Sequence, residues 1–491
     1  MSPTPIISTA QMRAMDAAAP GFGAPVRALM ERAGEAVAQA IMARFSPRPT
    51  AVFCGPGANG GDGWVCARVL HSAGWPVWVE TLASRESLTD AAAVAASAFA
   101  GPTLPLGDAS APAAELVVDA LFGAGLSRPL EGPARAMARA WAARPEAVVA
   151  IDVPSGLPGD GGPPLGEIAF RAGLTVSFEA LKPAHVLEPG RSLCGEVVIA
   201  PISMPPGAIA AAGRPLAVEN APALWLANFP QPGVSAHKHA RGHAMVVSGG
   251  MTQTGAARLA AIGALRAGAG LVTVLSPPDA VMVHAAHLTA VMLKKIMDED
   301  ALAEAVTGAS VVVIGPALGL AADKREGVLA VLRSPARAVL DADVFSLFRG
   351  EPDTLFAALR AGDVLTPHLG EFNRVFPGLL ASKPNRIEAA KEAAARAGAV
   401  VLLKGPDTVI AAPDGRCAVN GVGTPYLATA GSGDVLAGII AGLVAQGMES
   451  FFAACAGAWL HGRCGEALGP GLIAEDLPGA LPSILCEVLQ L

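Results

Sequence analysis

The chain carries the sequence Leu427-Ala428-Thr429-Ala430-Gly431-Ser432-Gly433-Asp434 directly before the apolar, helix-compatible stretch 435–446. Gly431 and Gly433 allow backbone N–H groups to approach a phosphate closely, and a helix that begins near Asp434 adds unpaired N–H donors and the positive end of its dipole. Asp434 could then accept the proton of a hydroxyl that attacks the phosphoryl group. The alternative is a glycine turn in which Asp434 is only a helix N-cap.

Both halves of the chain alternate short β-branched runs with longer alanine-rich stretches, which predicts an α/β fold with parallel sheets covered by helices. A length of 491 residues favours two domains, and the proline- and glycine-rich segment 201–233 marks the junction between them. Strands are expected at 51–54, 77–80, 116–119, 148–152, 174–178 and 197–199, and at 245–248, 271–275, 311–314, 338–341, 364–366 and 400–403.

Composition excludes several classes of protein. A net charge of -7 without a Lys/Arg cluster argues against a nucleic-acid partner. The purest apolar runs, 435–445 and 451–460, are about half as long as a membrane-spanning helix, so no membrane association is expected. Seven cysteines without metal-ligand spacing, and a start that lacks a secretion signal, predict reduced thiols and a cytoplasmic location.

In the first half, polar groups follow three of the expected strands. Five glycines lie within residues 55–63, and Asp119 and Asp152 stand at the ends of two further strands. Because the carboxyl ends of parallel strands meet at one edge of a sheet, these loops are expected to converge on one pocket. The alternative for each aspartate is a turn or cap residue.

These motifs resemble those of a known family. The first half resembles the NAD(P)H-hydrate epimerase domain through Asn59-Gly60-Gly61-Asp62-Gly63, Asp119-Ala120-Leu121-Phe122-Gly123, Asp152-Val153-Pro154-Ser155-Gly156 and Lys182-Pro183. The second half resembles the ribokinase-like NAD(P)H-hydrate dehydratase through Asp341-Ala342-Asp343, Leu365-Thr366-Pro367-His368, Gly370-Glu371, Leu403-Lys404-Gly405 and the turn 431–434. Together the matches cover nearly the whole chain.

The resemblance implies a Rossmann-like three-layer α/β/α epimerase domain at 1–215, a linker at 216–234 and a ribokinase-like α/β dehydratase domain at 235–491. It implies repair of hydrated NADH and NADPH: the first domain interconverts the R and S hydrates, and the second dehydrates the S form with ADP, releasing AMP and phosphate. Magnesium is expected with the nucleotide, potassium in the epimerase domain, and a homo-oligomer as the assembly.

In the dehydratase half, the resemblance makes Asp434 the catalytic base and places the hydrate beside it, at Ala256, Gly319 and His368. Asp343 and Glu371 are expected to act through water or magnesium. The residues implied to hold the nucleotide are Lys404, Gly405, Pro406, Asp407, Thr408, Gly431, Ser432 and Gly433.

In the epimerase half, the resemblance assigns a potassium site to Asn59, Asp119 and Ser155, and Asp152 is the candidate proton carrier. Amide, carboxylate and hydroxyl oxygens are ligands that hard cations accept. The segments implied to bind the hydrate are Ala58, Asn59, Gly60, Gly61 and Asp62, then Gly123, Ala124, Gly125, Leu126, Ser127, Arg128 and Pro129, and Asp152.

Two other functions remain open from the sequence. The second half could be a small-molecule kinase on the same scaffold, which would leave a stable phosphorylated product and prefer ATP. The first half could be a ligand-binding or oligomerisation module without catalysis, in which case changes at Asp119 or Asp152 would not alter consumption of the R hydrate.

Overall fold

The computed structural model describes residues 3–108, 112–234 and 236–490, and the chain divides into two compact units, Thr4–Leu216 and Ala217–Leu491. Residues 1, 235 and 491, which bound the predicted domains, lie outside the described residues. Each unit is an α/β fold built on a largely parallel sheet, as predicted.

The first unit contains a fully parallel sheet with the strand order β4-β3-β2-β5-β6-β7-β8. The chain moves from β2 outward to β4 and then returns to β5 on the other side of β2, so the topological switch point lies between β2 and β5. The strands are β2 (Thr50–Cys54), β3 (Val77–Thr81), β4 (Thr103–Pro105), β5 (Leu116–Ala120), β6 (Val148–Ile151), β7 (Leu174–Phe178) and β8 (Glu196–Ala200).

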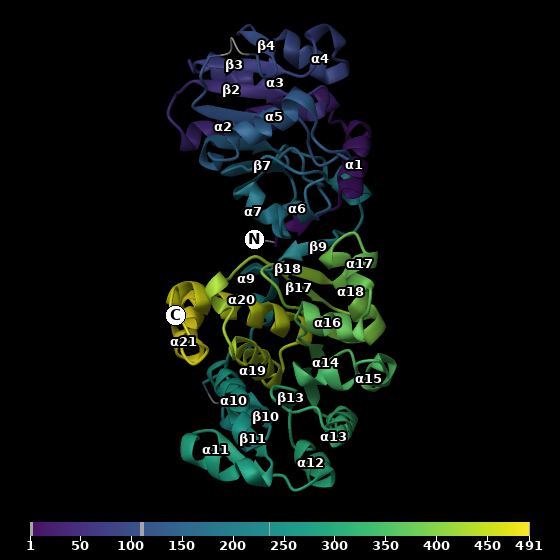
Figure 1. The fold of residues 1–491 in the computed structure, drawn as a ribbon, viewed down its shortest axis with the longest axis vertical. Coiled ribbons are helices and arrows are strands. Elements are labelled where there is room, and N and C mark those ends of the chain that lie inside the picture. The colour runs from purple at the N-terminus through teal and green to yellow at the C-terminus, as the bar shows by residue number, and fades with distance from the viewer. Residues whose placement is uncertain (1–2, 109–111, 235, 491) are drawn as a thin grey trace. The chain divides into compact units, whose positions relative to one another are not determined.

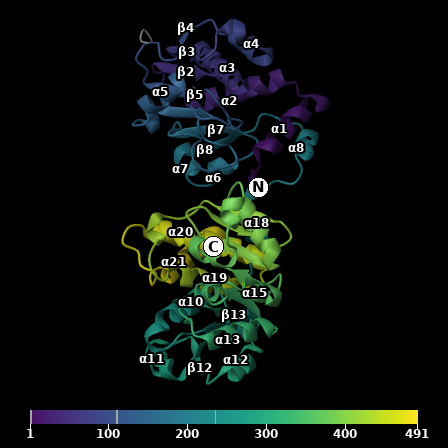
Figure 2. The same ribbon diagram turned by 45° about the vertical axis from the view of Figure 1, so that its right-hand side comes forward.

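Helices cover both faces of this sheet, because successive residues of a strand point to opposite faces. Val52 and Val118 pack with helices α2, α3 and α4, whereas Ala51 and Val117 pack with α5. The result is a three-layer arrangement: after the turn from Figure 1 to Figure 2, α5 lies on one side of the strands and α2 and α3 lie on the other. The helices are α1 (Thr9–Ala18), α2 (Val26–Arg44), α3 (Ala58–Ser72), α4 (Asp90–Ser97), α5 (Gly132–Trp141), α6 (Pro183–Val186), α7 (Gly190–Cys194) and α8 (Pro206–Ala211).

In the second unit the strand order is β9-β18-β17-β16-β15-β14-β13-β10-β11-β12, and only β17 runs antiparallel to its neighbours. Its switch point lies between β10 and β13. The strands are β9 (Ala217–Glu219), β10 (His243–Val247), β11 (Leu271–Ser276), β12 (Met292–Lys295), β13 (Val311–Ile314), β14 (Arg337–Leu340), β15 (Val364–Leu365), β16 (Val400–Leu403), β17 (Thr408–Ala411) and β18 (Cys417–Asn420).

One face of this sheet packs on α10, α19, α20 and α21, which form one continuous apolar core with it. Figures 1 and 2 both show α10 beside α19, while the green helices α13 to α18 gather on the other side of the strands in Figure 1. The helices are α9 (Pro222–Trp225), α10 (Thr254–Arg266), α11 (Val281–His287), α12 (Glu299–Val306), α13 (Ala322–Arg333), α14 (Asp343–Leu347), α15 (Pro352–Ala358), α16 (Leu369–Val375), α17 (Leu379–Ser382), α18 (Arg386–Ala397), α19 (Ser432–Ala445), α20 (Ser450–Leu468) and α21 (Leu477–Leu489).

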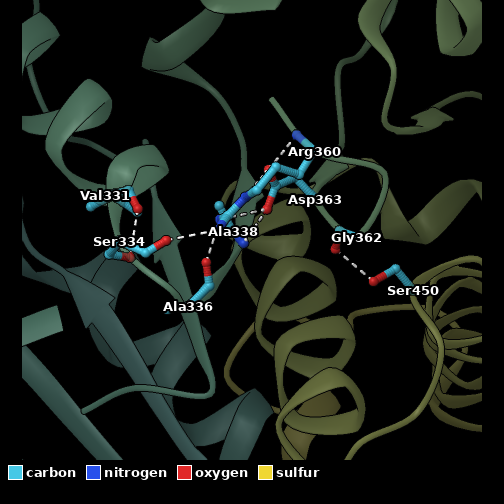
Figure 3. Close-up of polar contacts among 8 residues, drawn as sticks. All are labelled: Val331, Ser334, Ala336, Ala338, Arg360, Gly362, Asp363 and Ser450. Carbon is cyan, nitrogen blue, oxygen red and sulfur yellow. Dashed lines mark hydrogen bonds and ion pairs between the residues drawn. The ribbon is translucent and has the colours of Figure 1, made fainter. Parts of the chain in front are cut away.

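A polar network fixes the amino ends of β14 and β15 (Figure 3). The buried carboxylate of Asp363 accepts hydrogen bonds from the N–H groups of Ala338 and Arg360, both at 2.8 Å. The Arg360 guanidinium donates to the carbonyls of Ser334 (2.7 Å) and Ala336. These bonds join the starts of two neighbouring strands, β14 and β15. They therefore help to fix the register in which the two strands run toward their carboxyl ends.

All the predicted strands are present, with ends shifted by at most two residues. The segment 216–234, predicted as a linker, contains β9 and α9, which belong to the second unit: β9 pairs with β18, and Trp225 is fully buried in the core of that unit. No described helix is long and apolar enough to cross a membrane.

Candidate functional sites

In the second unit, the glycine turn directs the start of α19 toward the carboxyl ends of the strands. Gly431 is the N-cap residue with φ +85°, a conformation that favours glycine, and the helix begins at Ser432. The N–H groups of the first turn therefore have no partner within the helix. A methyl group placed on Gly433 would lie 3.3 Å from Lys404 Nζ. The Ser432 N–H donates to the Thr429 carbonyl at 3.4 Å, and the turn combines the remaining N–H groups with a nearby ammonium group, as an anion site requires.

Asp434 lies in this first turn, among charged residues from two strand ends. Lys404, which follows β16, donates a 2.7 Å hydrogen bond to Asp341, which follows β14. Burial, reinforced by Asp341 and opposed by Lys404, raises the pKa of Asp434 to about 6. Burial alone would lower the pKa of Lys404, but Asp341, Glu371 and Asp434 raise it above its usual value. A carboxyl with a pKa near 6 beside an ammonium group is suited to accept a proton near neutral pH.

His368 and Glu371 adjoin this cluster. His368 is the N-cap of α16: its Nδ1 accepts the N–H of Gly370 at 2.9 Å, and Glu371 Oε2 accepts the N–H of His368 at 2.8 Å. Glu371 Oε2 is also 3.9 Å from Lys404 Nζ. The two residues therefore form a capping box, and Nε2 of His368 lies 3.3 Å from Glu371 Oε1. The side chain of His368 is 54 % exposed and remains accessible to a ligand.

The predicted nucleotide loop, 404–408, connects β16 to β17. Thr408 Oγ1 donates to the carbonyl of Gly405 at 2.8 Å, which closes a compact turn. The carboxylate of Asp407 is buried and forms an ion pair with Arg386 of α18. Asp407 therefore holds the loop against α18, and Pro406 lies beside it. The sequence around Arg386 gives no local signal of this contact.

Ala256 and Gly319 lie on different elements of the same sheet edge. Ala256 is in the first turn of α10, which packs along α19. Gly319 follows β13 with φ +92°, and its N–H donates to Asp343 Oδ2 at 2.9 Å. Asp343 thus orders the Gly319 loop, a role that the sequence did not suggest.

His461 is a further residue of this site that the sequence did not reveal. It lies on α20, and its Nε2 is 3.0 Å from both the carbonyl oxygen and Oγ of Ser432. Because a carbonyl only accepts, Nε2 carries the proton. Burial lowers the pKa of His461 to about 4, so the ring is neutral and holds the first residue of α19 in place. A lone histidine in an apolar helix carries no local sequence signal of such a contact.

The first unit contains a cavity of about 660 Å³ at the carboxyl edge of its sheet. Its walls come from α1, α2, the start of α3 and the loops after β5 and β6. Ten of the predicted hydrate-binding residues line it: Ala58, Asn59, Asp62, Gly123, Ala124, Gly125, Leu126, Ser127, Arg128 and Asp152.

Three further predicted residues lie beside the cavity. A methyl group on Gly60 would come within 1.9 Å of the Gly55 carbonyl, and one on Gly61 within 2.5 Å of Met30. These glycines therefore allow α3 to pack closely. Pro129 follows the lining residue Arg128 and contacts Gly166 instead.

Asp152 is the most strongly held carboxylate of this cavity. It adopts φ +69°, which is unusual for a residue other than glycine. Oδ1 lies 2.6 Å from Nζ of Lys182, a fully buried lysine, and Oδ2 accepts the N–H of Ala124 at 2.8 Å. Burial alone would raise the pKa of Asp152, but Lys182 and these hydrogen bonds hold it below its usual value. Asp152 is therefore ionised at neutral pH.

His185 of α6 contacts the backbone of both members of this pair. Its Nδ1 accepts the Lys182 N–H at 3.0 Å, so Nε2 carries the proton and donates to the Asp152 carbonyl at 2.7 Å. Burial and Lys182 lower the pKa of His185 to about 4. The sequence motif contained Lys182 but gave neither residue a role.

The three residues of the predicted potassium site occupy adjoining positions. Asp119 is fully buried and accepts hydrogen bonds from Ser155 Oγ and Ser155 N, both at 2.7 Å. Ser155 Oγ lies 3.0 Å from the carbonyl of Phe122. Burial raises the pKa of Asp119 to about 6. Asn59 Oδ1 faces Gly123, and Asn59 Nδ2 makes no hydrogen bond within the described part of the chain.

Comparison with known proteins matches each unit to a family. Residues 26–184 match a family model described as YjeF-related protein N-terminus, and residues 244–484 match one described as NAD(P)H-hydrate dehydratase. The chain is 35 % identical over 524 residues to the bifunctional NAD(P)H-hydrate repair enzyme Nnr of Salinibacter ruber, covering 98 % of this chain and 96 % of that protein. It is also 35 % identical over 488 residues to the enzyme of the same name from Coxiella burnetii, covering 96 % and 98 %.

A crystal structure of the ADP/ATP-dependent NAD(P)H-hydrate dehydratase from Bacillus subtilis, co-crystallized with ATP/Mg²⁺, is 29 % identical. The match covers 53 % of this chain and 95 % of the Bacillus subtilis chain, with a TM-score of 0.45. The fold of each unit and the two family matches define a two-domain α/β enzyme. The chain belongs to the family of bifunctional NAD(P)H-hydrate repair enzymes.

Proposed function

We propose that this protein repairs hydrated NADH and NADPH. The first unit interconverts the R and S hydrates, and the second uses ADP to convert the S hydrate to NAD(P)H, AMP and phosphate. The observation that carries the proposal is the position of Asp434. It lies in the first turn of α19, beside the amides of 431–433 and the ammonium group of Lys404. Membership of the repair family supports both halves of the reaction.

The dehydration begins with phosphoryl transfer. Asp434 accepts the proton of the ring hydroxyl as its oxygen attacks the terminal phosphorus of ADP, and the bond from that phosphorus to the bridging oxygen breaks to release AMP. The free N–H groups of the glycine turn and Lys404 offset the negative charge of the phosphoryl group. Phosphate is a much better leaving group than hydroxide.

Elimination then follows. The ring nitrogen donates its lone pair as the carbon–oxygen bond breaks, and the electron pair of that bond leaves with phosphate. Loss of a proton from the adjacent ring carbon restores the double bond of the reduced nicotinamide. The hydroxyl oxygen of the hydrate therefore ends in inorganic phosphate, and no water is released.

The epimerisation uses the cavity of the first unit. Asp152, ionised beside Lys182, is the proton carrier for this exchange of water, and its charge stabilises a cationic ring. The hydrate is held by the glycine-rich start of α3 and by the loop 123–128. Residues 58–62, 123–129 and 152 are the proposed hydrate-binding segments of the first unit. In the second unit, Ala256, Gly319 and His368 are proposed to bind the hydrate.

Potassium fits the residues predicted for it. Asp119 is a buried carboxylate that makes no ion pair with another described residue, and it lies among the oxygens of Ser155 and Phe122. A monovalent cation would supply the missing positive charge, and Asn59 would add an amide oxygen. Bound there, the cation would fix the strand-end loops that shape the cavity.

Magnesium is expected to arrive with ADP, held largely by phosphate oxygens and water as is usual for this ion. The described residues include no group of three His, Cys, Asp or Glu side chains that could hold a metal. Lys404 to Thr408 and Gly431 to Gly433 are the proposed nucleotide contacts. A cytoplasmic homo-oligomer without nucleic-acid or membrane partners completes the proposal.

The test follows absorbance at 340 nm as the full-length protein acts on mixed R and S NADH hydrate with magnesium and potassium, and with ADP, with ATP or with neither. We expect full recovery of NADH with ADP. Asp434→Asn should abolish recovery, and Asp152→Ala should leave a fast partial phase followed by a slow one. Failure of the wild-type protein with both nucleotides would reject the dehydratase, and a stable phosphorylated product would indicate a kinase.

A further inference from the structure

Three carboxyl groups line the cavity of the first unit, and the buried lysine forms an ion pair with only one of them. Asp16 comes from α1, Asp62 from α3, and Asp152 from the loop after β6. Nζ of Lys182 lies 2.6 Å from Asp152 Oδ1 and donates to Ser177 Oγ at 2.9 Å. Lys182 therefore pairs directly with Asp152, and its charge also opposes the rise that burial causes in the pKa of Asp16.

Asp16 and Asp62 both lack a direct partner among the described residues, but Lys182 lowers the pKa of Asp16, whereas the neighbouring charges only raise the pKa of Asp62. The structure gives the Asp62 side chain no hydrogen bond or ion pair with a described residue. Its backbone is packed under α2, where a methyl group on Gly34 would approach the Asp62 carbonyl to 2.6 Å. The carboxyl is thus carried on a fixed part of α3, at the cavity wall and free to contact a ligand.

The charged groups around Asp62 favour its neutral form. Burial raises the pKa of Asp62 well above its usual value, and Asp152 and Asp16 add to that rise. Burial raises the pKa of the Cys66 thiol, one turn along α3, so that this thiol is uncharged. Arg13 and Arg128 also line the cavity and are its other cations. Asp62 consequently keeps its proton to a higher pH than Asp152 does.

We propose that Asp62 is the proton donor, and Asp152 the proton acceptor, when the first unit converts the R hydrate to the S hydrate. The two carboxyls come from different walls of one cavity, and only one of them is paired with a cation. A pair of carboxyl groups held in opposite protonation states is the arrangement that acid–base catalysis requires. This inference rests on the proposed epimerase function and assigns a role that substrate binding alone does not give to Asp62.

The Asp62 carboxyl gives its proton to the ring hydroxyl, the carbon–oxygen bond breaks with its electron pair on oxygen, and water leaves while the ring nitrogen forms a double bond to the ring carbon. Water then adds to the other face of that carbon, and Asp152 takes the proton it loses. Asp62 is now ionised and Asp152 protonated, which is the state required for the reverse reaction. Exchange with solvent restores the forward state.

The experiment compares full-length Asp62→Asn with the wild-type protein, using R hydrate, excess ADP and magnesium, so that epimerisation limits the appearance of NADH. We expect the rate above the spontaneous background to fall about 100-fold or more. The single phase seen with pure S hydrate should keep its wild-type rate. Because asparagine has the size and neutrality of a protonated aspartate, the unfolding midpoint should stay near that of the wild-type protein.

Two further variants separate acid catalysis from shape. Asp62→Glu should retain part of the activity and move the high-pH limb of its profile, whereas Asp62→Asn should lose that limb. Glu86→Gln, which removes a fully exposed carboxylate of the same unit, should match the wild-type protein. If the wild-type protein epimerises the R hydrate and Asp62→Asn is equally active, the inference about Asp62 is wrong but the proposed epimerase function stands. Absence of epimerisation in the wild-type protein would overturn the proposed function instead.

Discussion

The ion pair of Lys182 and Asp152 gives the most quantitative prediction. In the wild-type protein the buried Lys182 Nζ lies 2.6 Å from Asp152 Oδ1. Lys182→Met removes this ammonium group, and the Asp152 carboxylate keeps the hydrogen bond from the Ala124 N–H. Removing one partner of a buried ion pair leaves the other charge uncompensated and lowers the free energy of unfolding by about 3–5 kcal/mol. For a unit of this size that lowers its thermal midpoint by roughly 10 °C.

The double variant isolates the pair itself. Asp152→Asn leaves the Lys182 ammonium uncompensated and should cost a similar free energy. Lys182→Met with Asp152→Asn removes both charges, so its loss should be smaller than the sum of the single losses by about 2 kcal/mol. Differential scanning calorimetry at pH 7 measures all three variants. At that pH the effect is complete, because the folded-state pKa of Asp152 is depressed and its contribution is lost only on acidification through that value.

A surface pair provides the matched control. Lys324 and Asp323 form an ion pair at 2.9 Å, but both side chains are largely exposed. Lys324→Met should change the unfolding free energy by no more than about 0.5 kcal/mol. Additive losses in the Lys182 and Asp152 cycle, within about 0.5 kcal/mol, would refute the claim that these two charges stabilise each other.

Three further predictions concern the two reaction centres. The kcat/KM for the S hydrate should fall as pH drops below about 6, because Asp434 must be ionised to accept a proton. In Asp341→Asn the rate–pH profile should show this fall at lower pH, because Asp341 raises the pKa of Asp434. His461→Ala should lower kcat for dehydration about 10-fold or more through loss of the bonds to Ser432, and His461→Gln should restore part of it; an unchanged kcat would exclude the positioning role. Potassium should raise the unfolding midpoint of the first unit in the wild-type protein but not in Ser155→Ala, by calorimetry with sodium as the control; equal shifts in both would contradict the assigned cation site.

The central strands could be predicted because each is a short, fully buried apolar run. The strands that were not predicted include β4, β9, β12, β17 and β18, and two of them show why the signal was weak. β12 is an edge strand that ends in Lys294 and Lys295 and is mostly exposed, so it lacks the apolar signal. β9 lies in a proline-rich segment that reads as a linker, and only its pairing with β18 reveals it. Tertiary pairing determines such strands more than local composition does.

The sites were predictable where their chemistry is local. Gly431 and Asp434 share one turn, so their relation is visible in the sequence. Lys182 pairs with a residue thirty positions earlier, and His461 contacts Ser432 across a separation of 29. Nothing in the sequence around either residue indicates the partner. Long-range contacts of this kind, and the pKa shifts they cause, required the folded structure.

The central claim is that dehydration proceeds by phosphoryl transfer to the hydrate, with Asp434 as the base. The most direct measurement uses S hydrate carrying ¹⁸O in its ring hydroxyl, with ADP, magnesium and the full-length protein, and follows the label by mass spectrometry. The account predicts one labelled oxygen in inorganic phosphate for each NADH formed, and no label in AMP. Label released as water would contradict it, because the hydroxyl would then leave without ever having been phosphorylated.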